Sequence, residues 1–380
     1  MNKGKFALFS ALEITYWGFH ASFIGYASSY LLSRGVSNTM MSLLIAGFLL
    51  CAFVGSMFFG RLCDRHQTNK RVFLPCMLAS YAMILDIFFF AEYAPVICVC
   101  YPLLGFFFQP QGANADAWVL SAYDHDQKMY GKIRSMPSLF YAVISIVMGR
   151  LISRFGYGMM LVGATLFMAL ALISAVLLAD ARAISVQQRG MNLRDVRRLF
   201  ASRPYRRLVL LLLLIGLAIA PINNLKIVVL ENVGGNVAHI GVDSFVSALT
   251  QVPFIAMAGL LSLISLRRRF AAMALLPLTM ILLVRFASSP AMVFAGSFFA
   301  NVGYGVLLPT MREVTERFVD EDLRNLGHNL SDAVYNSFSG VISLMCAGAI
   351  VDGFGMNAML TLCVVIAVIP AALSMKKLDN

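Results

Sequence analysis

The chain has 380 residues, of which only 13% are charged, whereas 59% are of hydrophobic and aromatic types. Soluble domains average about 25% charged residues, so a surface this poor in charge argues against a soluble protein. The net charge of +11 does not indicate a nucleic-acid partner, because the basic residues lie in short loops between apolar runs. The composition therefore predicts a protein embedded in a membrane.

Twelve apolar segments follow one another along the chain, each about as long as a hydrocarbon layer of roughly 30 Å requires. In the first half they are residues 6–30, 39–60, 72–91, 95–121, 134–154 and 158–179. In the second half they are residues 206–231, 243–266, 270–288, 290–311, 328–352 and 357–375. The period-two alternation of a membrane strand is absent from the sequence. We therefore predict an all-α membrane protein with twelve transmembrane helices in two six-helix bundles.

The basic residues indicate how these helices cross the membrane. Most of the 30 lysines and arginines fall in alternate loops, including Lys3, Arg61, Lys132 and the run 267–269. The positive-inside rule places such loops in the cytoplasm, which also puts both chain ends there. The first apolar run is as long as a full span and lacks a small-residue cleavage site, so no cleaved signal is expected. The predicted location is the inner or plasma membrane.

One long connection, residues 180–205, divides the chain into bundles 1–179 and 206–380. Within it, apolar residues recur at helical spacing and arginines fill the other face. These apolar residues are Leu193, Val196, Leu199 and Phe200. This pattern predicts a short amphipathic helix on the anionic cytoplasmic lipid surface, serving as a tether or, alternatively, as a regulatory element.

The two halves also resemble each other at the end of one span. The sequence GRLISRFG at 149–156 ends the fifth span, and GAIVDGFG at 348–355 ends the eleventh. Met-Leu follows at the same offset in both halves. Equivalent positions in the two halves favour two parallel repeats, an arrangement found in transporters.

A recognisable motif occupies the second predicted cytoplasmic loop. Its residues are Gly60, Asp64, Arg65, Lys70 and Arg71. The pattern resembles the signature of the major facilitator superfamily, in which these residues form an inward gate. Gly60 is then expected to allow close helix approach, and Asp64 to cap or pair with a helix end. Gln67 stands where that family usually has a second glycine, and the alternative is a solvated basic loop.

The strongest candidate for solute recognition is Asp116 on the fourth predicted span with Arg134 at the start of the fifth. Such groups are costly in lipid and normally face a cavity or a partner. With Tyr141, this segment resembles the lactose permease branch, the oligosaccharide:proton symporters. The resemblance implies that Asp116 and Arg134 bind solute hydroxyls and that Tyr141 stacks on a ring. The alternative is a structural ion pair between two helices.

Further polar residues fall within the predicted spans and are candidates for binding solute. They are Gln109, Trp17, His20, Asn223, Asn224, Gln251 and Asn336. Glu13, Asp86 and Arg285 are candidates for proton coupling, and Glu13 shares a helical face with Trp17 and His20. By the resemblance, Arg285 matches an arginine of the permease's coupling network. The histidine, glutamate, aspartates and lysine of that network are missing, so Glu13 is the preferred proton carrier and facilitated diffusion is the rival.

The predicted function is secondary-active transport of a small polar solute, sugar-like or nucleoside-like, by proton symport. The alternative is an efflux pump for amphipathic compounds, although the fifth span lacks the Gly-Pro motif that is common in antiporters of the superfamily. No catalytic triad, nucleotide loop or metal motif appears, so we expect no enzyme activity, no metal and no cofactor. The seven cysteines are expected to be reduced. The expected partners are the solute, protons and the lipid bilayer, with no nucleic acid, and the protein is expected to be a monomer.

Overall fold

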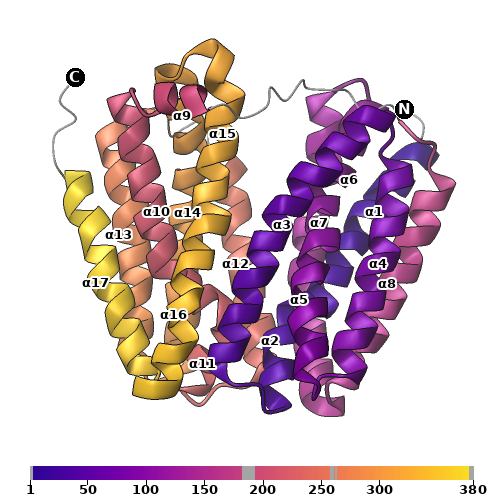
Figure 1. The fold of residues 1–380 in the computed structure, drawn as a ribbon, viewed down its shortest axis with the longest axis horizontal. Helices are drawn as coiled ribbons and strands as arrows, with labels where there is room; N and C mark the ends of the chain where they lie inside the picture. The colour runs from indigo at the N-terminus through magenta and orange to yellow at the C-terminus, as the bar shows by residue number, and fades with distance from the viewer. Residues whose placement is uncertain (1–2, 182–192, 257–260, 262, 376–380) are drawn as a thin grey trace. The chain divides into compact units, whose positions relative to one another are not determined.

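The computed structural model describes residues 3–181, 193–256, 261 and 263–375. The chain forms two compact units of helices (Figure 1). The first unit contains residues 1–188 and 236–245, and the second contains residues 189–235 and 246–380. The short segment 236–245, the start of α12 (Val237–Ala256), thus packs with the first unit although the sequence assigns it to the second half. The predicted boundaries at 179 and 206 stay a prediction.

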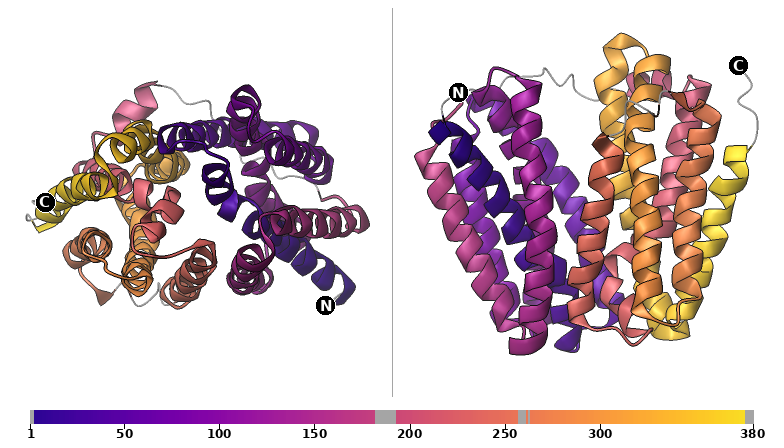
Figure 2. Two further views of the ribbon diagram at one scale, coloured as in Figure 1. Left: turned by 90° about the horizontal axis from the view of Figure 1, so that it is seen from below. Right: turned by 180° about the vertical axis from the view of Figure 1, so that it is seen from behind.

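The first unit is built from helices that run close to one another, as their end-on view shows (Figure 2). They are α1 (Lys3–Ser22), α2 (Ile24–Ser33), α3 (Asn38–His66), α4 (Lys70–Phe89), α5 (Ala94–Phe108), α6 (Pro110–Ala122), α7 (Gln127–Phe155) and α8 (Gly158–Leu177). In two of them the residue just before the helix caps free backbone N–H groups with its own side chain. The Ser37 hydroxyl accepts from the Met40 amide at the start of α3, and the Asp126 carboxylate accepts from the Lys128 amide at the start of α7.

The second unit holds the remaining elements. They are α9 (Leu193–Leu199), α10 (Arg203–Asn224), α11 (Lys226–Glu231), most of α12, α13 (Leu266–Arg285), α14 (Pro290–Phe318), the 3₁₀ turn η2 (Glu321–Leu323), α15 (Arg324–Ala333), the π-helical turn η3 (Val334–Phe338), α16 (Ser339–Phe354) and α17 (Met356–Met375). Residues 182–192 of the predicted linker, 257–260 and 262 of the eighth predicted span, and both chain termini lie outside the described residues.

Three predicted spans are broken rather than continuous. Phe23 separates α1 from α2, Gln109 separates α5 from α6, and Leu225 separates α10 from α11. Prolines explain two of these breaks. Pro110 directly follows Gln109, and Pro221 lies four residues before Leu225. Neither has a backbone N–H that could donate to a carbonyl of the preceding turn. In the first break Tyr26 N bonds to Phe23 O, three residues back instead of four.

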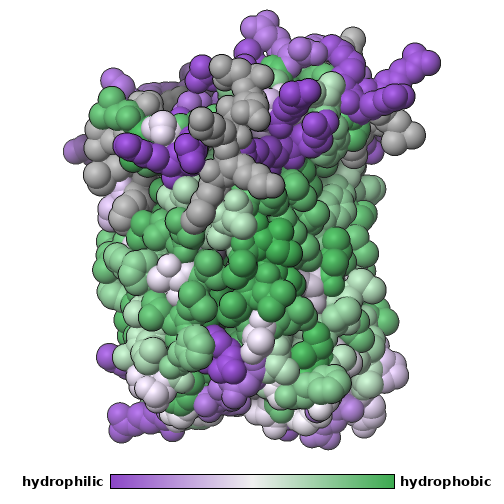
Figure 3. All heavy atoms as spheres, turned by 90° about the vertical axis from the view of Figure 1, so that its left-hand side faces the viewer, coloured by the Kyte–Doolittle hydropathy of each residue, from purple (hydrophilic) through white to green (hydrophobic). Residues whose placement is uncertain are grey.

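Nine helical segments of the described chain are long and apolar enough to cross a membrane. The other three predicted spans correspond to α1–α2, α12 and α13, so the count of twelve stays a prediction. One face of the molecule carries a belt of hydrophobic residues, with hydrophilic residues gathered at its two ends (Figure 3). This distribution is typical of a protein whose middle lies in lipid.

Close packing within the first unit depends on two glycines. A Cβ at Gly55 would lie 2.3 Å from the Phe106 carbonyl oxygen, and a Cβ at Gly105 would lie 2.3 Å from that of Phe48. The two glycines therefore allow the backbones of α3 and α5 to touch, as small residues commonly do between membrane helices. This contact holds α5, and with it α6, which carries Asp116.

Candidate functional site

Asp116 and Arg134 form an ion pair inside the first unit. Arg134 Nε lies 3.2 Å from Asp116 Oδ1, and the side chains of Arg134 and Asp116 are 32% and 29% exposed. The pairing agrees with the sequence, because the short turn at 123–126 returns the chain antiparallel from α6 to α7. Arg134 lies two turns inside α7, not at its mouth as predicted, since the helix already begins at Gln127. The partial exposure leaves the pair accessible to a solute.

Aromatic rings surround the arginine. The Arg134 guanidinium carbon lies 5.1 Å from the centre of the Trp17 ring, a cation–π distance. Tyr141 meets Trp17 edge to face at 6.2 Å, and the His20 ring lies 5.7 Å from each of them. Four predicted site residues, two from α1 and two from α7, are therefore brought together. Their role in binding stays a prediction.

Glu13 lies one turn before Trp17 on the same helix. Its side chain is 0% exposed, and neither carboxyl oxygen makes a hydrogen bond of good geometry among the described residues, although the Trp17 indole N–H lies near enough to interact with the carboxyl. It is close enough to Asp116 and Arg134 to interact with both electrostatically. A buried charge without a partner costs several kcal/mol, roughly, so the neutral carboxylic acid fits this position better than the carboxylate.

Two more buried polar atoms of α1 near Glu13 make no hydrogen bond of good geometry in the described part of the chain. They are Trp17 Nε1 and His20 Nδ1. Buried polar groups are normally hydrogen-bonded, and exceptions call for an explanation. The partly exposed ion pair offers both donors and acceptors beside aromatic faces. The set of groups suits a solute that carries hydroxyl or amide groups on a ring.

One residue of this site was missed by the sequence prediction. The Tyr130 hydroxyl lies within hydrogen-bond reach of the Asp116 carboxylate. Tyr130 precedes Arg134 by four residues on α7, so the helical spacing from Arg134 could have identified it. Gln109, by contrast, is exposed at the α5–α6 break and has no contact with the pair among the described residues. The Tyr16 hydroxyl donates to the Phe108 carbonyl at this break, at 3.2 Å.

The predicted solute-binding amides of the second unit do not gather into a comparable cluster. Asn224 Nδ2 donates to the Ala220 carbonyl of its own helix at 2.8 Å, and Asn223 is exposed. No contact joins these two, Gln251 and Asn336 to one another among the described residues. Asn336 lies within η3, a π-helical turn, and such turns often occur at functional sites.

Two aromatic residues of the second unit were not predicted. The rings of Tyr304 on α14 and Tyr335 in η3 stack at 6.0 Å. Isolated tyrosines in apolar spans gave no signal for this stack, because it depends on the packing of helical segments that lie apart in the chain.

The two remaining candidates for proton coupling lie elsewhere. The Asp86 carboxylate faces Cys100, whose thiol donates to Asp86 Oδ2 at 3.8 Å across α4 and α5. Arg285 is the last residue of α13, and its Nε donates to Thr361 Oγ1 on α17 at 3.0 Å. Neither makes a described contact with the Glu13 cluster, so only Glu13 among the three is placed beside the ion pair.

The predicted gating motif differs from the expectation at two positions. A Cβ at Gly60 would meet nothing within 4 Å, so this glycine does not serve a close helix approach in this structure. The Asp64 side chain makes no ion pair or hydrogen bond among the described residues. Gln67 ends α3 with φ of 51°, in the left-handed region that favours glycine. That geometry gives a physical reason why the resembling family has glycine there.

Asp180, which the sequence prediction did not single out, connects the motif to α8. Its carboxylate accepts hydrogen bonds from the Thr68 hydroxyl and from the amides of Asn69 and Lys70, at the start of α4. In return, Lys70 Nζ donates to the carbonyls of Val176 and Leu178 at the end of α8, at 2.6 and 2.7 Å. A carboxylate at one helix start and an ammonium at the other helix end match both helix dipoles. Arg65 and Arg71 are exposed.

We expect Asp180→Ala to destabilise the protein by about 1–2 kcal/mol, because α4 loses its N-terminal cap. The thermal unfolding midpoint of the purified protein in detergent measures this effect. Asp64→Ala is the matched control, since it removes a carboxylate four residues before Thr68 that lacks a described partner. Equal midpoints for the two variants would contradict the assignment of the cap to Asp180.

The second unit has its own ionic contacts at its hydrophilic end. Arg269 at the start of α13 binds Glu313 of α14 through two N–H···O contacts of 2.5 and 2.8 Å. Arg198 of α9 binds Asp320 and Asp322 at 2.9 Å each. Leu199, the next residue, is 1% exposed. Arg198 and Leu199 of this helix therefore contact the protein, whereas the sequence predicted that the helix lies on lipid.

Apolar helices of spanning length, with a partly exposed ion pair and a buried carboxyl among them, are typical of a multi-pass membrane protein with a polar interior site. The chain belongs to the MFS_1 like family, whose sequence profile matches residues 9–362. A search of curated protein sequences found no match.

Solved structures of transporters share this fold. The crystal structure of the nucleoside transporter NupG aligns with a TM-score of 0.80 at 14% identity, covering 98% of each chain. A bacterial homologue of the human lysosomal transporter Spinster, in an inward-facing and unoccupied conformation, aligns with a TM-score of 0.73 at 11% identity. That alignment covers 99% of this chain and 97% of the homologue. At such identities the likeness shows the major facilitator fold and leaves the solute open.

Proposed function

We propose that this protein is a secondary-active transporter that moves a small polar solute, nucleoside-like or sugar-like, by alternating access with proton symport. The Asp116–Arg134 pair beside Trp17 carries this proposal. A guanidinium and a carboxylate offer donors and acceptors to hydroxyl groups, and an indole face suits a sugar ring or a base. The nucleoside transporter NupG has the same fold, which supports testing nucleosides first.

The resemblance to the lactose permease branch also supports the proposal, because that branch has a carboxylate and an arginine on consecutive helices. Asp116 is one methylene shorter than the glutamate of that branch, and Tyr141 stands in place of its tryptophan. A different solute shape is therefore expected. We assign proton coupling to Glu13, because its carboxyl is buried, makes no hydrogen bond of good geometry among the described residues and lies beside the ion pair.

Efflux of amphipathic compounds is the second candidate. The aromatic surface around His20, made by Trp17, Tyr141 and Phe108, favours it, since flat apolar cations bind well to such rings. The ion pair distinguishes the candidates, because a cationic drug needs only the carboxylate, whereas a neutral polar solute uses both partners.

The experiment that tests the proposal is an uptake screen in cells that produce the protein, across nucleosides, sugars and cationic dyes. We expect accumulation of a nucleoside or sugar over cells with the empty vector. Energy-dependent expulsion of dyes without uptake of any polar solute would overturn the proposal in favour of efflux. If none of the three classes of compound is transported, both uptake of these solutes and efflux of these dyes are rejected.

We also propose twelve spans with both termini in the cytoplasm of the inner or plasma membrane. The basic residues at one end of the helices support this orientation, among them Arg65, Lys132 and Arg198. A reporter fused to the C-terminus is expected to be active only if it functions in the cytoplasm. A fusion that is active only outside the cytoplasm would contradict the orientation.

A further inference from the structure

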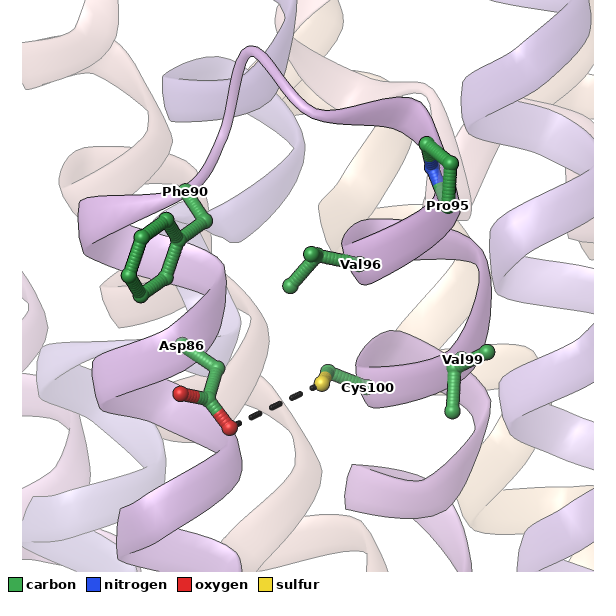
Figure 4. Close-up of a pocket in the computed structure, with 6 residues that line it drawn as sticks. All are labelled: Asp86, Phe90, Pro95, Val96, Val99 and Cys100. Atoms are coloured by element: carbon green, nitrogen blue, oxygen red, sulfur yellow. Dashed lines mark hydrogen bonds between the residues drawn. The ribbon is translucent and has the colours of Figure 1, made fainter.

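A groove with a volume of about 450 Å³ lies between the end of α4 and the start of α5 in the first unit (Figure 4). Its lining residues are Asp86, Phe90, Pro95, Val96, Val99 and Cys100. Asp86 is the one charged member of this set, and its carboxylate points across the groove towards Cys100. The remaining wall is apolar apart from the thiol.

The groove opens on an exposed hydrophobic surface. Phe89 is 64% exposed, Val99 57% and Phe90 47%, and these side chains come from both helices. In a multi-pass membrane protein a surface of this kind is solvated by acyl chains. Asp86 lies three residues before the end of α4, which is about 4.5 Å along the helix axis. A carboxylate within one turn of the helix end lies near the border between acyl chains and headgroups.

Asp86 lacks a cation in the described part of the chain. Its described polar contact is the weak thiol donor of Cys100 at 3.8 Å. At the same end of the helices, Arg34 pairs with Glu92 at 3.5 Å and lies over the Tyr30 ring at 5.4 Å. An ionised carboxylate at a lipid-facing position is costly unless a counter-charge reaches it. The groove therefore combines an unneutralised acid with a surface that fits acyl chains.

We propose that this groove binds a phospholipid whose headgroup ends in a primary ammonium, with the ammonium on Asp86 and an acyl chain along Val96 and Val99. A primary ammonium supplies three N–H donors and a compact positive charge, so it can form charge-assisted hydrogen bonds with the carboxylate. A trimethylammonium headgroup has the same charge but no donor. An anionic headgroup would be repelled. The site therefore selects phosphatidylethanolamine over phosphatidylcholine and phosphatidylglycerol.

Native mass spectrometry of the purified full chain tests this selection, with the three lipids added separately and matched in acyl chains. We expect phosphatidylethanolamine to bind about tenfold more tightly than phosphatidylcholine, as the loss of a charged hydrogen bond implies. Asp86→Asn is expected to remove this preference. Glu92→Gln is the control, because it removes a nearby carboxylate whose side chain is 74% exposed and outside the groove.

A second variant keeps the proposal testable if Asp86→Asn does not fold. Val99→Trp fills the groove and leaves the carboxylate intact, and it is expected to lower phosphatidylethanolamine binding as well. Equal binding of the ethanolamine and choline lipids would overturn the proposal. So would full selectivity in folded Asp86→Asn protein, or tighter binding of a single-chain alkylammonium than of the phospholipid, which would assign the groove to cationic amphiphiles.

Discussion

Asp116→Asn and Arg134→Ala are each expected to abolish uptake of the solute while the protein remains folded in the membrane. Each change removes one side of the donor–acceptor pair that holds the solute. Leaving one partner of a fully buried pair uncompensated costs on the order of 3–5 kcal/mol. Here the stability loss is expected to be smaller, because both side chains are close to one third exposed and water screens the remaining charge.

Initial uptake rates, normalised to the amount of monodisperse protein after solubilisation, measure this effect. Glu92→Gln is the matched control, because it breaks the exposed Arg34–Glu92 ion pair of the same unit and is expected to retain uptake. Exchanging the two charges, Asp116→Arg with Arg134→Asp, separates binding from structure. If the pair only joins α6 to α7, the exchange restores uptake. If it binds the solute, the exchanged protein folds but stays inactive. Normal uptake by either single variant would show that the site assignment is wrong.

Glu13→Gln is expected to abolish proton movement coupled to the solute while solute binding persists. The substitution keeps the shape of the side chain and removes its titratable proton. Its effect on stability is expected to be small or favourable, because it replaces a buried acid without a described hydrogen-bond partner by a neutral amide. Purified protein in liposomes with an internal pH-sensitive dye measures the proton movement after solute is added outside.

Wild-type protein is expected to acidify the liposome lumen as solute enters, and Glu13→Gln is not. Solute-driven acidification that survives Glu13→Gln would place the proton on another group. Glu92→Gln is a useful control, since Glu92 pairs with Arg34 and its side chain is 74% exposed. Uptake by the wild-type protein without any proton movement would favour facilitated diffusion. That alternative is open because the second half of the chain lacks the coupling residues of the permease.

The sequence predicted the membrane class, the family and the helical pairing that brings Asp116 to Arg134. These depend on composition, on the span pattern and on the short turn between α6 and α7, all of which are local. The sequence also placed Glu13, Trp17 and His20 on one face of α1, but the helix spacing could not say that this face meets Arg134. The packing of α1 against α7 supplies that information.

Other features depend on tertiary structure that no local pattern encodes. The break at Phe23 has no proline beside it, and Gly25 alone, inside an apolar run, does not predict a break. Asp180 caps α4 from a position more than a hundred residues away in the chain, and the sequence therefore assigned it only to the predicted linker 180–205. The open space around Gly60 and the partnerless Asp64 side chain likewise depend on how neighbouring helices pack. The sequence assigned the arginine face of the linker helix to lipid, because the acidic turn that binds Arg198, at Asp320 and Asp322, lies more than a hundred residues later in the chain.

The most direct measurement uses the tryptophans of the chain, which number two. Trp118 is fully buried and bonds to the Ala179 carbonyl, whereas Trp17 lies against Arg134. In a Trp118→Phe variant, Trp17 alone reports on the site by its fluorescence. The solute found by the uptake screen is expected to change Trp17 emission saturably, and Arg134→Ala in this background is expected to remove the change. A transported solute that leaves Trp17 emission unaltered, or that alters it equally without Arg134, would contradict a binding site at the Asp116–Arg134 pair.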